Sequence, residues 1–374
     1  MKYKKSIVTF YLLFLFALLV GFEYLLGVVY PRSPDPTITD RSIILKELTP
    51  GYQHILSHDN SITNLSVSDM KPVNLSVNKN GFIVGPNDTY TSKSPKIIFF
   101  GGSTTENIKA DEDKRFPYAV SKYILEKNGS FVTTLNAGVS GNNTIHSVLN
   151  LFAKGISEDA KIAVLMNNTN DISGLSRTNS YWDAGYYRSV VQSKRGYGHY
   201  LLTPLRLYFP NFYYLLLDLR MELSNTKTLS EWASVDYIDI DNKEDMLRDF
   251  KRATETFVNI SKIWGIEPVL MTQPKLHNTN RDDIRKEYNK TRAVLDYDDF
   301  IYMHDQFNDI VRRVALKEKI LLIDLDKEFS WKGDYFYDWI HFNNQGNIEA
   351  AKFISDKLIE FHKPLFNTVN NSAL

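Results

Sequence analysis

The hydrophobic pattern of the first thirty residues differs from that of the rest of the chain. An almost unbroken apolar run extends from Ile7 to Tyr30, and three lysines precede it. A run of this length can cross the hydrocarbon core of a bilayer, and the basic residues ahead of it place the N-terminus in the cytoplasm. A cleaved signal peptide would have an apolar region of only about 7–15 residues and a small-x-small site. We therefore predict an uncleaved single-pass transmembrane anchor over residues 1–30, with the rest of the chain extracytoplasmic.

Residues 31–95 have a different, mostly polar pattern. This stretch is rich in Ser, Asn, Asp and Pro, and short apolar pieces such as Gly81–Val84 interrupt it. Such a composition favours irregular structure over a continuous packed element. We interpret it as a stalk followed by a segment that leads into the main domain and packs on it.

From residue 96 onward, short apolar runs alternate with segments of helical spacing. Short apolar strands between helices are typical of a parallel sheet buried between two layers of helices. We therefore predict an α/β domain over residues 96–365, with a parallel sheet of about five strands and its function at the carboxyl ends of the strands. The predicted strands are Ile97–Phe100, Phe131–Asn136, Ile162–Met166, Pro268–Met271 and Ile320–Ile323, and the predicted helices are Arg115–Lys127, Asn143–Lys154, Lys243–Trp264, Phe300–Leu316 and Asn347–Phe361.

One stretch, at about residues 175–240, does not follow this alternation. It lies between the third and fourth predicted strands and is crowded with Tyr, Phe and Trp. One interpretation is a helical insertion with a small core of its own. The other is a lid or substrate platform, because aromatic faces suit sugars, acyl chains and membrane interfaces. Both interpretations can hold together.

Composition and charge narrow the range of functions. The 374-residue chain has 43% apolar residues, which suffices for a large core, and its 44 basic and 44 acidic residues cancel. No basic excess points to nucleic acid. The absence of cysteine removes thiol nucleophiles, thiolate metal sites and disulfides together. No cluster has metal-ligand spacing, no nucleotide fingerprint occurs, and we expect no cofactor.

A glycine-rich turn follows the first strand of the predicted domain. In Gly101-Gly102-Ser103 the serine comes directly after the apolar run, at the expected carboxyl end of a strand. The glycines let the backbone turn sharply. The turn lacks the Gly-Lys-Ser/Thr ending of a nucleotide-binding loop. Ser103 is therefore a candidate nucleophile, although an ordinary turn would have a similar sequence.

A serine nucleophile needs a base, which is usually a histidine oriented by a carboxylate. Of the eight histidines, only His341 has an acid three residues before it, namely Asp338. Chance alone supplies roughly one such pair in a chain of this composition. The position of the pair, just before the last predicted helix, is the stronger argument, and we take it as the candidate base and orienting acid.

Two further strand ends offer hydrogen-bond donors for an oxyanion. Asn136–Asn142 follows the second strand and Asn167–Asp171 follows the third. The fourth strand ends near Gln273, which is a candidate substrate contact. Each loop is commonplace alone, but together they bring Gly, Ser and Asn to one edge of the predicted sheet.

The ordered set of motifs resembles the SGNH (GDSL-like) hydrolase superfamily over about residues 73–362. The resemblance implies a flavodoxin-like three-layer αβα fold. It also implies a triad of Ser103, Asp338 and His341. The oxyanion hole would consist of the backbone N–H groups of Ser103 and Gly141 and the side chain of Asn170.

The sequence departs from the family pattern at two positions. Gly102 replaces the usual Asp before the nucleophile, and Asn168 replaces the usual Gly two residues before Asn170. The first change keeps the conformational freedom that the turn needs. The second changes the loop that aims Asn170.

The sequence therefore predicts a membrane-anchored serine esterase that removes acyl groups, with acetyl the expected one, from a cell-surface or extracellular glycan. Because an acyl-enzyme is common to both reactions, an O-acyltransferase that moves acetyl onto a polysaccharide is the alternative, and it would have a membrane acyltransferase as a possible partner. A third hypothesis is an inactive family member that binds a glycan or a partner through the aromatic insertion.

Overall fold

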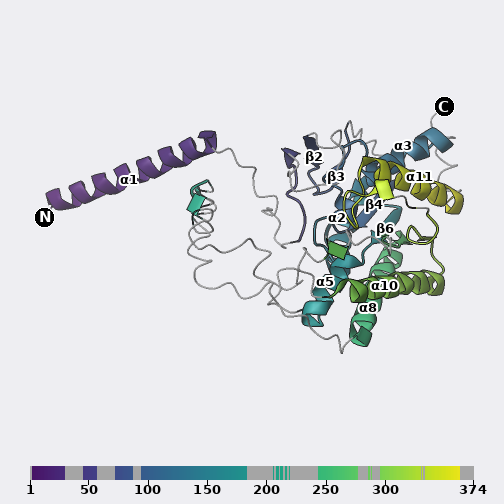
Figure 1. The fold of residues 1–374 in the computed structure, drawn as a ribbon. Coiled ribbons are helices and arrows are strands. Elements are labelled where there is room, and N and C mark those ends of the chain that lie inside the picture. The colour runs from purple at the N-terminus through teal and green to yellow at the C-terminus, as the bar shows by residue number, and fades with distance from the viewer. Residues whose placement is uncertain are drawn as a thin grey trace. The chain divides into compact units, whose positions relative to one another are not determined.

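The computed structural model describes residues 2–29, 45–56, 72–86, 94–182, 243–276 and 295–362, except 330 and 332, together with isolated positions within 205–219 and 285–288. The chain forms two compact units, each made of two segments. Unit 1 comprises Met1–Pro34 and Gln192–Ser234, and unit 2 comprises Asp35–Val191 and Val235–Leu374. Figure 1 shows the elements of both units in the order of the chain.

The first described element of unit 1 is the long apolar helix α1 (Lys2–Val29). Its part Thr9–Val29 has a mean hydropathy of 2.4 and is almost entirely exposed. At 1.5 Å per residue it is about 30 Å long, which matches the hydrocarbon thickness of a bilayer. This helix has the length and composition of a membrane span, although a signal sequence would have them too.

The only acid within this apolar span has hydrogen-bond partners in the second segment of unit 1. The carboxylate of Glu23 accepts hydrogen bonds from the backbone N–H groups of Asn211, at 2.7 Å, and Phe212, at 2.8 Å. The ring of Phe22 packs edge-on against that of Phe212. Backbone donors thus compensate a carboxylate that would be costly to leave unpaired in an apolar environment.

Unit 2 is built on one mixed sheet of eight strands in the order β1-β2-β3-β5-β4-β6-β7-β8. Its five strands from β5 to β8 are parallel. The strands are β1 (Gln53–Leu56), β2 (Val73–Val77), β3 (Ile83–Val84), β4 (Lys96–Gly101), β5 (Thr133–Asn136), β6 (Ile162–Met166), β7 (Glu267–Met271) and β8 (Leu322–Ile323).

The described sheet is therefore larger than the predicted one of about five parallel strands. Three antiparallel strands extend the sheet beyond β5, and they come from the stretch that we interpreted as a stalk and a leading segment. In β2, the side chains of Val73, Leu75 and Val77 are buried and alternate with polar residues. Alternation over so few residues is a weak sequence signal, and pairing with neighbouring strands determines the structure here.

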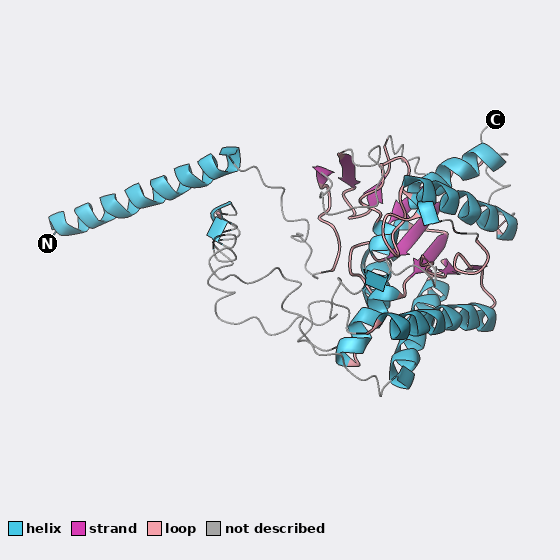
Figure 2. Cartoon of the chain, viewed as in Figure 1, coloured by secondary structure: helices cyan, strands magenta, loops and turns pink. Residues whose placement is uncertain are grey.

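Helices cover both faces of the parallel strands (Figures 1 and 2). In β4, Ile97 and Phe99 pack with the helices of one face, and Ile98 and Phe100 with those of the other, because successive side chains of a strand point in opposite directions. The first face carries α3 (Phe116–Asn128) and α11 (Asn344–Phe361), and the second carries α4 (Thr144–Asn150), α5 (Thr169–Thr178), α8 (Lys243–Ile263) and α10 (Tyr297–Glu318).

Short helical turns complete the described elements. Helix α2 (Ser103–Glu106) follows β4 directly. A π-helical turn, η2 (Leu151–Gly155), and a 3-10 turn, η3 (Ile156–Glu158), continue α4, so the predicted helix Asn143–Lys154 changes its winding after Asn150. A further 3-10 turn, η5 (Gly333–Tyr335), precedes α11.

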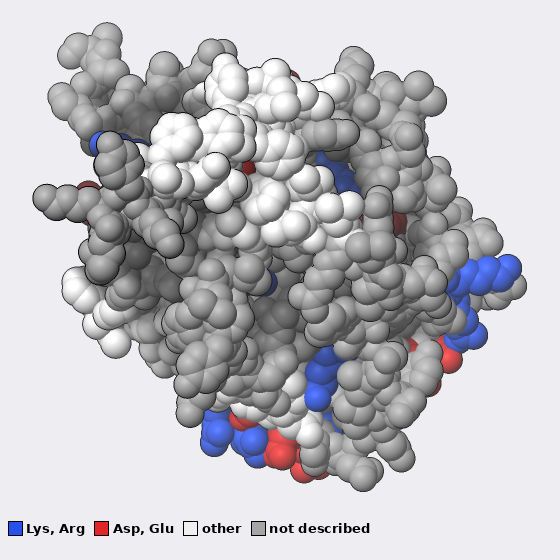
Figure 3. All heavy atoms as spheres, turned by 90° about the vertical axis from the view of Figure 1, so that its left-hand side faces the viewer, with Lys and Arg blue, Asp and Glu red and all other residues white. Residues whose placement is uncertain are grey.

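The aromatic-rich insertion lies largely outside the described residues, and so neither the lid nor the platform interpretation is tested. The charged surface is described in part. On the face shown in Figure 3, described Lys and Arg side chains lie beside described Asp and Glu side chains, in keeping with the zero net charge of the chain.

Candidate active site

Ser103 lies where the sequence pattern predicts it, at the carboxyl end of β4 and the start of α2. The two glycines before it are required by close packing. A Cβ atom at Gly102 would lie 2.2 Å from Nδ2 of Asn170, and one at Gly101 would lie 2.6 Å from the backbone oxygen of Met166. Gly102 thus lets the side chain of Asn170 approach the nucleophile turn.

Ser103, His341 and Asp338 form a continuous chain of hydrogen bonds. His341 Nε2 is 2.7 Å from Ser103 Oγ, and His341 Nδ1 is 2.7 Å from Asp338 Oδ2. The other carboxylate oxygen, Oδ1, accepts hydrogen bonds from the backbone N–H groups of Ile340, at 2.9 Å, and His341, at 2.7 Å. Asp338 is therefore fixed in place and directs its second oxygen at the imidazole.

Electrostatics favour an ionised Asp338. Partial burial alone would raise its pKa, but the neighbouring His341 and three hydrogen bonds lower the pKa below its ordinary value. The ring of Tyr337 stacks on the imidazole of His341, with a 5.4 Å centroid separation and 5° between the planes. The imidazole is thus oriented by a carboxylate at one edge and by an aromatic ring on one face.

The residues predicted to bind an oxyanion lie at the same edge of the sheet as Ser103. Residues Val139–Asn142 form a tight turn in which Asn142 N–H donates to Val139 O at 2.9 Å, and Gly141 has a φ of 75°, which glycine adopts without strain. Asn170 Nδ2 donates to Asn142 O at 2.9 Å. This bond holds the side-chain amide of Asn170 beside the Val139–Asn142 turn.

Among the residues that the structure describes, two backbone N–H groups of these turns make no hydrogen bond. They are those of Ser103 and Gly141.

A pocket of about 300 Å³ is lined by Ser103, Asp338, His341 and Asn170. One part of its lining comes from α5, which contributes polar side chains such as Ser173 and Arg177. Another part is apolar and largely buried, and consists of Tyr288, Leu295, Phe300, Trp339 and Ile340. The pocket therefore has room for a small group next to Ser103 and offers both polar and aromatic contacts.

Three buried amides, which we call the amide cluster, hold the loop of Asn170. They are Asn168, Gln273 and Asn308, each at most 5% exposed. Asn308 Oδ1 accepts from Asn168 Nδ2 at 2.9 Å and from the backbone N–H of Gln273 at 3.2 Å. Asn308 Nδ2 donates to the backbone oxygen of Gln273 at 2.9 Å. The cluster thus connects the ends of β6 and β7 to α10.

The side chain of Asn168 also contacts α10 directly. Asn168 Nδ2 also donates to the backbone oxygen of His304 at 2.9 Å. The loop is therefore held to two successive turns of α10 by this one side chain.

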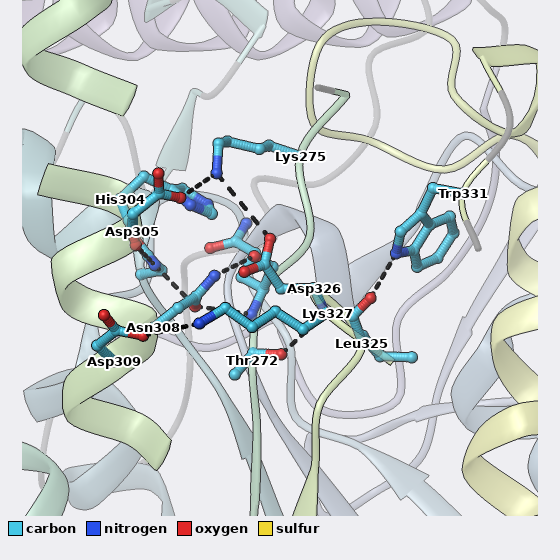
Figure 4. Close-up of polar contacts among 12 residues, drawn as sticks. Thr272, Lys275, His304, Asp305, Asn308, Asp309, Leu325, Asp326, Lys327 and Trp331 are labelled. Atoms are coloured by element: carbon cyan, nitrogen blue, oxygen red, sulfur yellow. Dashed lines mark hydrogen bonds and ion pairs between the residues drawn. The ribbon is translucent and has the colours of Figure 1, made fainter. Parts of the chain in front are cut away.

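Charged side chains strengthen the same contact between α10 and the strand ends (Figure 4). Lys275, after β7, pairs with Asp305 of α10 and lies 3.9 Å from Asp326. Arg312 of α10 binds Asp324 at 2.6 Å and Asp326 at 2.8 Å. Burial alone would lower the pKa of Arg312, but the hydrogen bonds that it donates to these carboxylates raise the pKa above its ordinary value. The arrangement fixes α10 relative to β7 and β8.

A second buried carboxyl group lies near the candidate triad. Burial raises the pKa of Glu106 to about 7, although a hydrogen bond from Ser140 and the charges of Arg115 and His341 act in the opposite direction. Ser140 directly precedes Gly141, so Glu106 holds the turn that presents the Gly141 N–H.

All predicted site residues therefore gather at one edge of the sheet. Gln273, the candidate substrate contact, lines the pocket, and its side-chain amide is bonded to the protein at both ends. Sequence analysis missed Glu106, Asn168 as a structural support, and Asn308. Only the proximity of Glu106 to Ser103 in the sequence could have pointed to one of them. Within the described part of the chain, no group of three or more His, Asp and Glu side chains could hold a metal ion.

Comparisons with known proteins give distant structural similarity. No protein-family model matches the sequence, and no curated protein matches it. Similar solved structures include a GDSL-like lipase from Bacteroides thetaiotaomicron, with 11% identity, coverage of 73% of this chain and 90% of that chain, and a TM-score of 0.39. A lipase/acylhydrolase from Enterococcus faecalis has 14% identity, 71% and 96% coverage, and a TM-score of 0.42.

An acetylxylan esterase from Geobacillus stearothermophilus is also similar, with 12% identity, coverage of 74% of this chain and 95% of that chain, and a TM-score of 0.40. Similarity at this level assigns neither an activity nor catalytic residues to this chain.

Proposed function

We propose that this protein is a serine esterase that uses Ser103 as nucleophile, His341 as general base and Asp338 as the orienting acid. The observation that carries the proposal is the pair of 2.7 Å contacts that link Ser103 Oγ through the imidazole to Asp338. A serine hydroxyl becomes an effective nucleophile when such a base accepts its proton during attack. Asp338 stabilises the imidazolium that forms.

The oxyanion of the tetrahedral intermediate would be bound by three donors. They are the N–H groups of Ser103 and Gly141 and the side-chain amide of Asn170. Preorganised donors of this kind stabilise the charge that develops in the transition state. His341 then donates its proton to the leaving oxygen, and water hydrolyses the acyl-enzyme.

We propose a short acyl group, with acetyl the expected one, on an extracytoplasmic glycan as the substrate. A pocket of about 300 Å³ is at the lower end of the range for ligand sites, and this size favours a short acyl group over a long chain. The hydroxyls of α5 and the ring of Trp339 offer contacts that suit a sugar. Helix α1 would anchor the protein in the membrane.

Fluorophosphonate labelling tests the nucleophile directly. The full-length protein should be labelled, and Ser103→Ala should not. Ser173→Ala is the matched control, because Ser173 lines the same pocket, and it should be labelled like the wild type. Labelling of Ser103→Ala, or no labelling of the wild type, would overturn the proposal.

Incubation with acetylated oligosaccharides identifies the reaction. Release of acetate is the expected result. If the acetyl group instead reaches an added glycan and no acetate appears, the enzyme is a transferase, and the esterase assignment is wrong while the triad assignment stands.

A further inference from the structure

The side chain of Gln273 joins the two loops that carry oxyanion donors. Its Oε1 accepts the backbone N–H of Thr169 at 3.0 Å, and its Nε2 donates to Oγ1 of Thr104 at 3.1 Å. Thr104 directly follows Ser103, and Thr169 directly precedes Asn170. One buried side chain therefore spans the distance between the nucleophile turn and the loop of the oxyanion amide.

This bridge uses both ends of the side-chain amide. A backbone N–H can only donate, so the atom that faces Thr169 must be oxygen, and the nitrogen consequently faces Thr104 and donates to its hydroxyl oxygen. A thioether of the same length has no donor for Thr104 and only a weak acceptor for Thr169.

The bridge is also anchored from behind. Asn308 binds both the N–H and the C=O of Gln273, and the same Asn308 oxygen binds Asn168. The backbone of Gln273 is thereby held against α10, which ion pairs fix to the ends of β7 and β8 (Figure 4). Gln273 is thus a rigid spacer between two loops.

We propose that Gln273 is a positioning residue that sets the spacing between the Ser103 N–H and the side chain of Asn170 in the oxyanion hole. This inference rests on the proposed function. Donors stabilise an oxyanion only when they lie about 2.7–3.1 Å from the place that the charged oxygen will occupy. Gln273 acts through both loops and need not touch the substrate.

Gln273→Met tests the proposal, because it removes both bonds and keeps the length of the side chain. With 4-nitrophenyl acetate, kcat should fall roughly tenfold or more, and KM should stay within about twofold, because the oxyanion forms only during attack. Gln345→Met is the matched control. It makes the same change at an exposed position of α11, where Gln345 bonds Glu349, and should leave kcat unchanged.

A double-mutant cycle separates positioning from plain stability. If Gln273 acts partly through Asn170, the loss from Gln273→Met should be clearly smaller in an Asn170→Ala background than in the wild type. Additive losses of kcat would contradict a role through Asn170.

Thr104→Val keeps the test decisive if Gln273→Met does not fold, since it removes only the acceptor of one bond. It should lower kcat by a smaller factor with KM again nearly constant. If the wild type is labelled by fluorophosphonate but Gln273→Met or Thr104→Val retains the wild-type kcat, the positioning inference is wrong. If the wild type is not labelled, the proposed function itself has failed.

Discussion

The two halves of the candidate site are built in different ways. In the triad half, three partly exposed side chains are linked by two direct contacts, and two of them come from one short loop. In the oxyanion half, Asn170 is aimed by the amide cluster, whose members come from β6, β7 and α10 and are buried. In the proposed site, the triad side chains are therefore partly exposed and joined by local contacts, whereas the amides that hold Asn170 are buried and come from three different elements.

The largest expected effect tests the triad half. Ser103→Ala or His341→Ala should each lower kcat by on the order of a thousandfold or more, because the triad acts as a unit. The measurement is kcat on a small ester. The double variant should lose little more than either single variant.

Thermal unfolding is the control for these variants, and their melting temperatures should stay near that of the wild type. If Ser103→Ala retains activity after contaminating esterases are excluded, Ser103 is not the nucleophile and the triad half has no basis.

The next effect tests the oxyanion half. Asn170→Ala should reduce kcat by roughly a hundred- to a thousandfold, which corresponds to about 3–4 kcal/mol of barrier. KM should hardly change, because the charge appears only during attack. Acylation by a fluorophosphonate should slow as well, and its rate provides an independent measurement.

Asn170 lies in the first turn of α5, and so a purely structural role is the competing explanation. In that case its loss would cost about 1 kcal/mol of stability, like the loss of a helix cap, and turnover would be nearly normal. A lower melting temperature with unchanged kcat would show that Asn170 stabilises the fold and does not bind the oxyanion.

A pH-dependent effect on stability comes from Glu106, which supports the Gly141 turn of the oxyanion half. Its pKa is about 7 in the folded protein against an ordinary value of 4.5. The folded state therefore binds more protons between these pH values, and the free energy of unfolding falls as the pH rises through this window. The loss amounts to about 3 kcal/mol at 1.36 kcal/mol per pKa unit.

Glu106→Gln removes this titration and can still accept the hydrogen bond from Ser140. The stability of the variant relative to the wild type should therefore increase between about pH 4.5 and about pH 7, as measured by thermal unfolding over this range. Asp171, another buried acid with a raised pKa, is present in both proteins and cancels. Glu126→Gln, at an exposed position of α3, should show no such trend. A parallel pH dependence for wild type and Glu106→Gln would mean that Glu106 is ionised in the folded state.

The sequence predicts the triad half of the site better than the buried amides of the oxyanion half. The spacing of Asp338 and His341 and the turn at Ser103 are local signals, and the structure brings these side chains together. The strands of the parallel sheet were also predicted, since apolar runs between helices have no other good burial. Asn308 gave no signal, because a polar residue on a helix is usually exposed and only its contacts with Gln273 reveal its use.

The exact ends of helices and strands were also predicted less well than their positions. Helices α10 and α11 begin three residues before their predicted starts, at Tyr297 and Asn344. The side chains of Asp296 and Asn343 accept hydrogen bonds from Asp299 N–H and Gly346 N–H and so cap the two helices. Polar caps of this kind extend a helix beyond its apolar pattern. The strands β1–β3 are short and were missed. The partner of β1 and one partner of β3 are distant in the sequence, although β2 and β3 pair locally.

The smallest expected effect on kcat comes from deleting α1, which leaves both halves of the site intact. Every residue of the triad and of the amide cluster belongs to unit 2, whereas α1 belongs to unit 1. Deletion of residues 1–30 should therefore leave kcat for a small soluble ester within about twofold of the full-length value, because the groups that set the barrier are retained.

The same deletion should remove the proposed anchor, since part of α1 has the length and composition to cross a membrane. Membrane fractionation of the full-length protein and of the deletion variant measures the second effect, and ester turnover measures the first. Full-length protein found in the soluble cytoplasmic fraction would contradict the anchor, and its activity would still test the site. A large loss of kcat in a folded deletion variant would contradict the assignment of both halves to unit 2 alone.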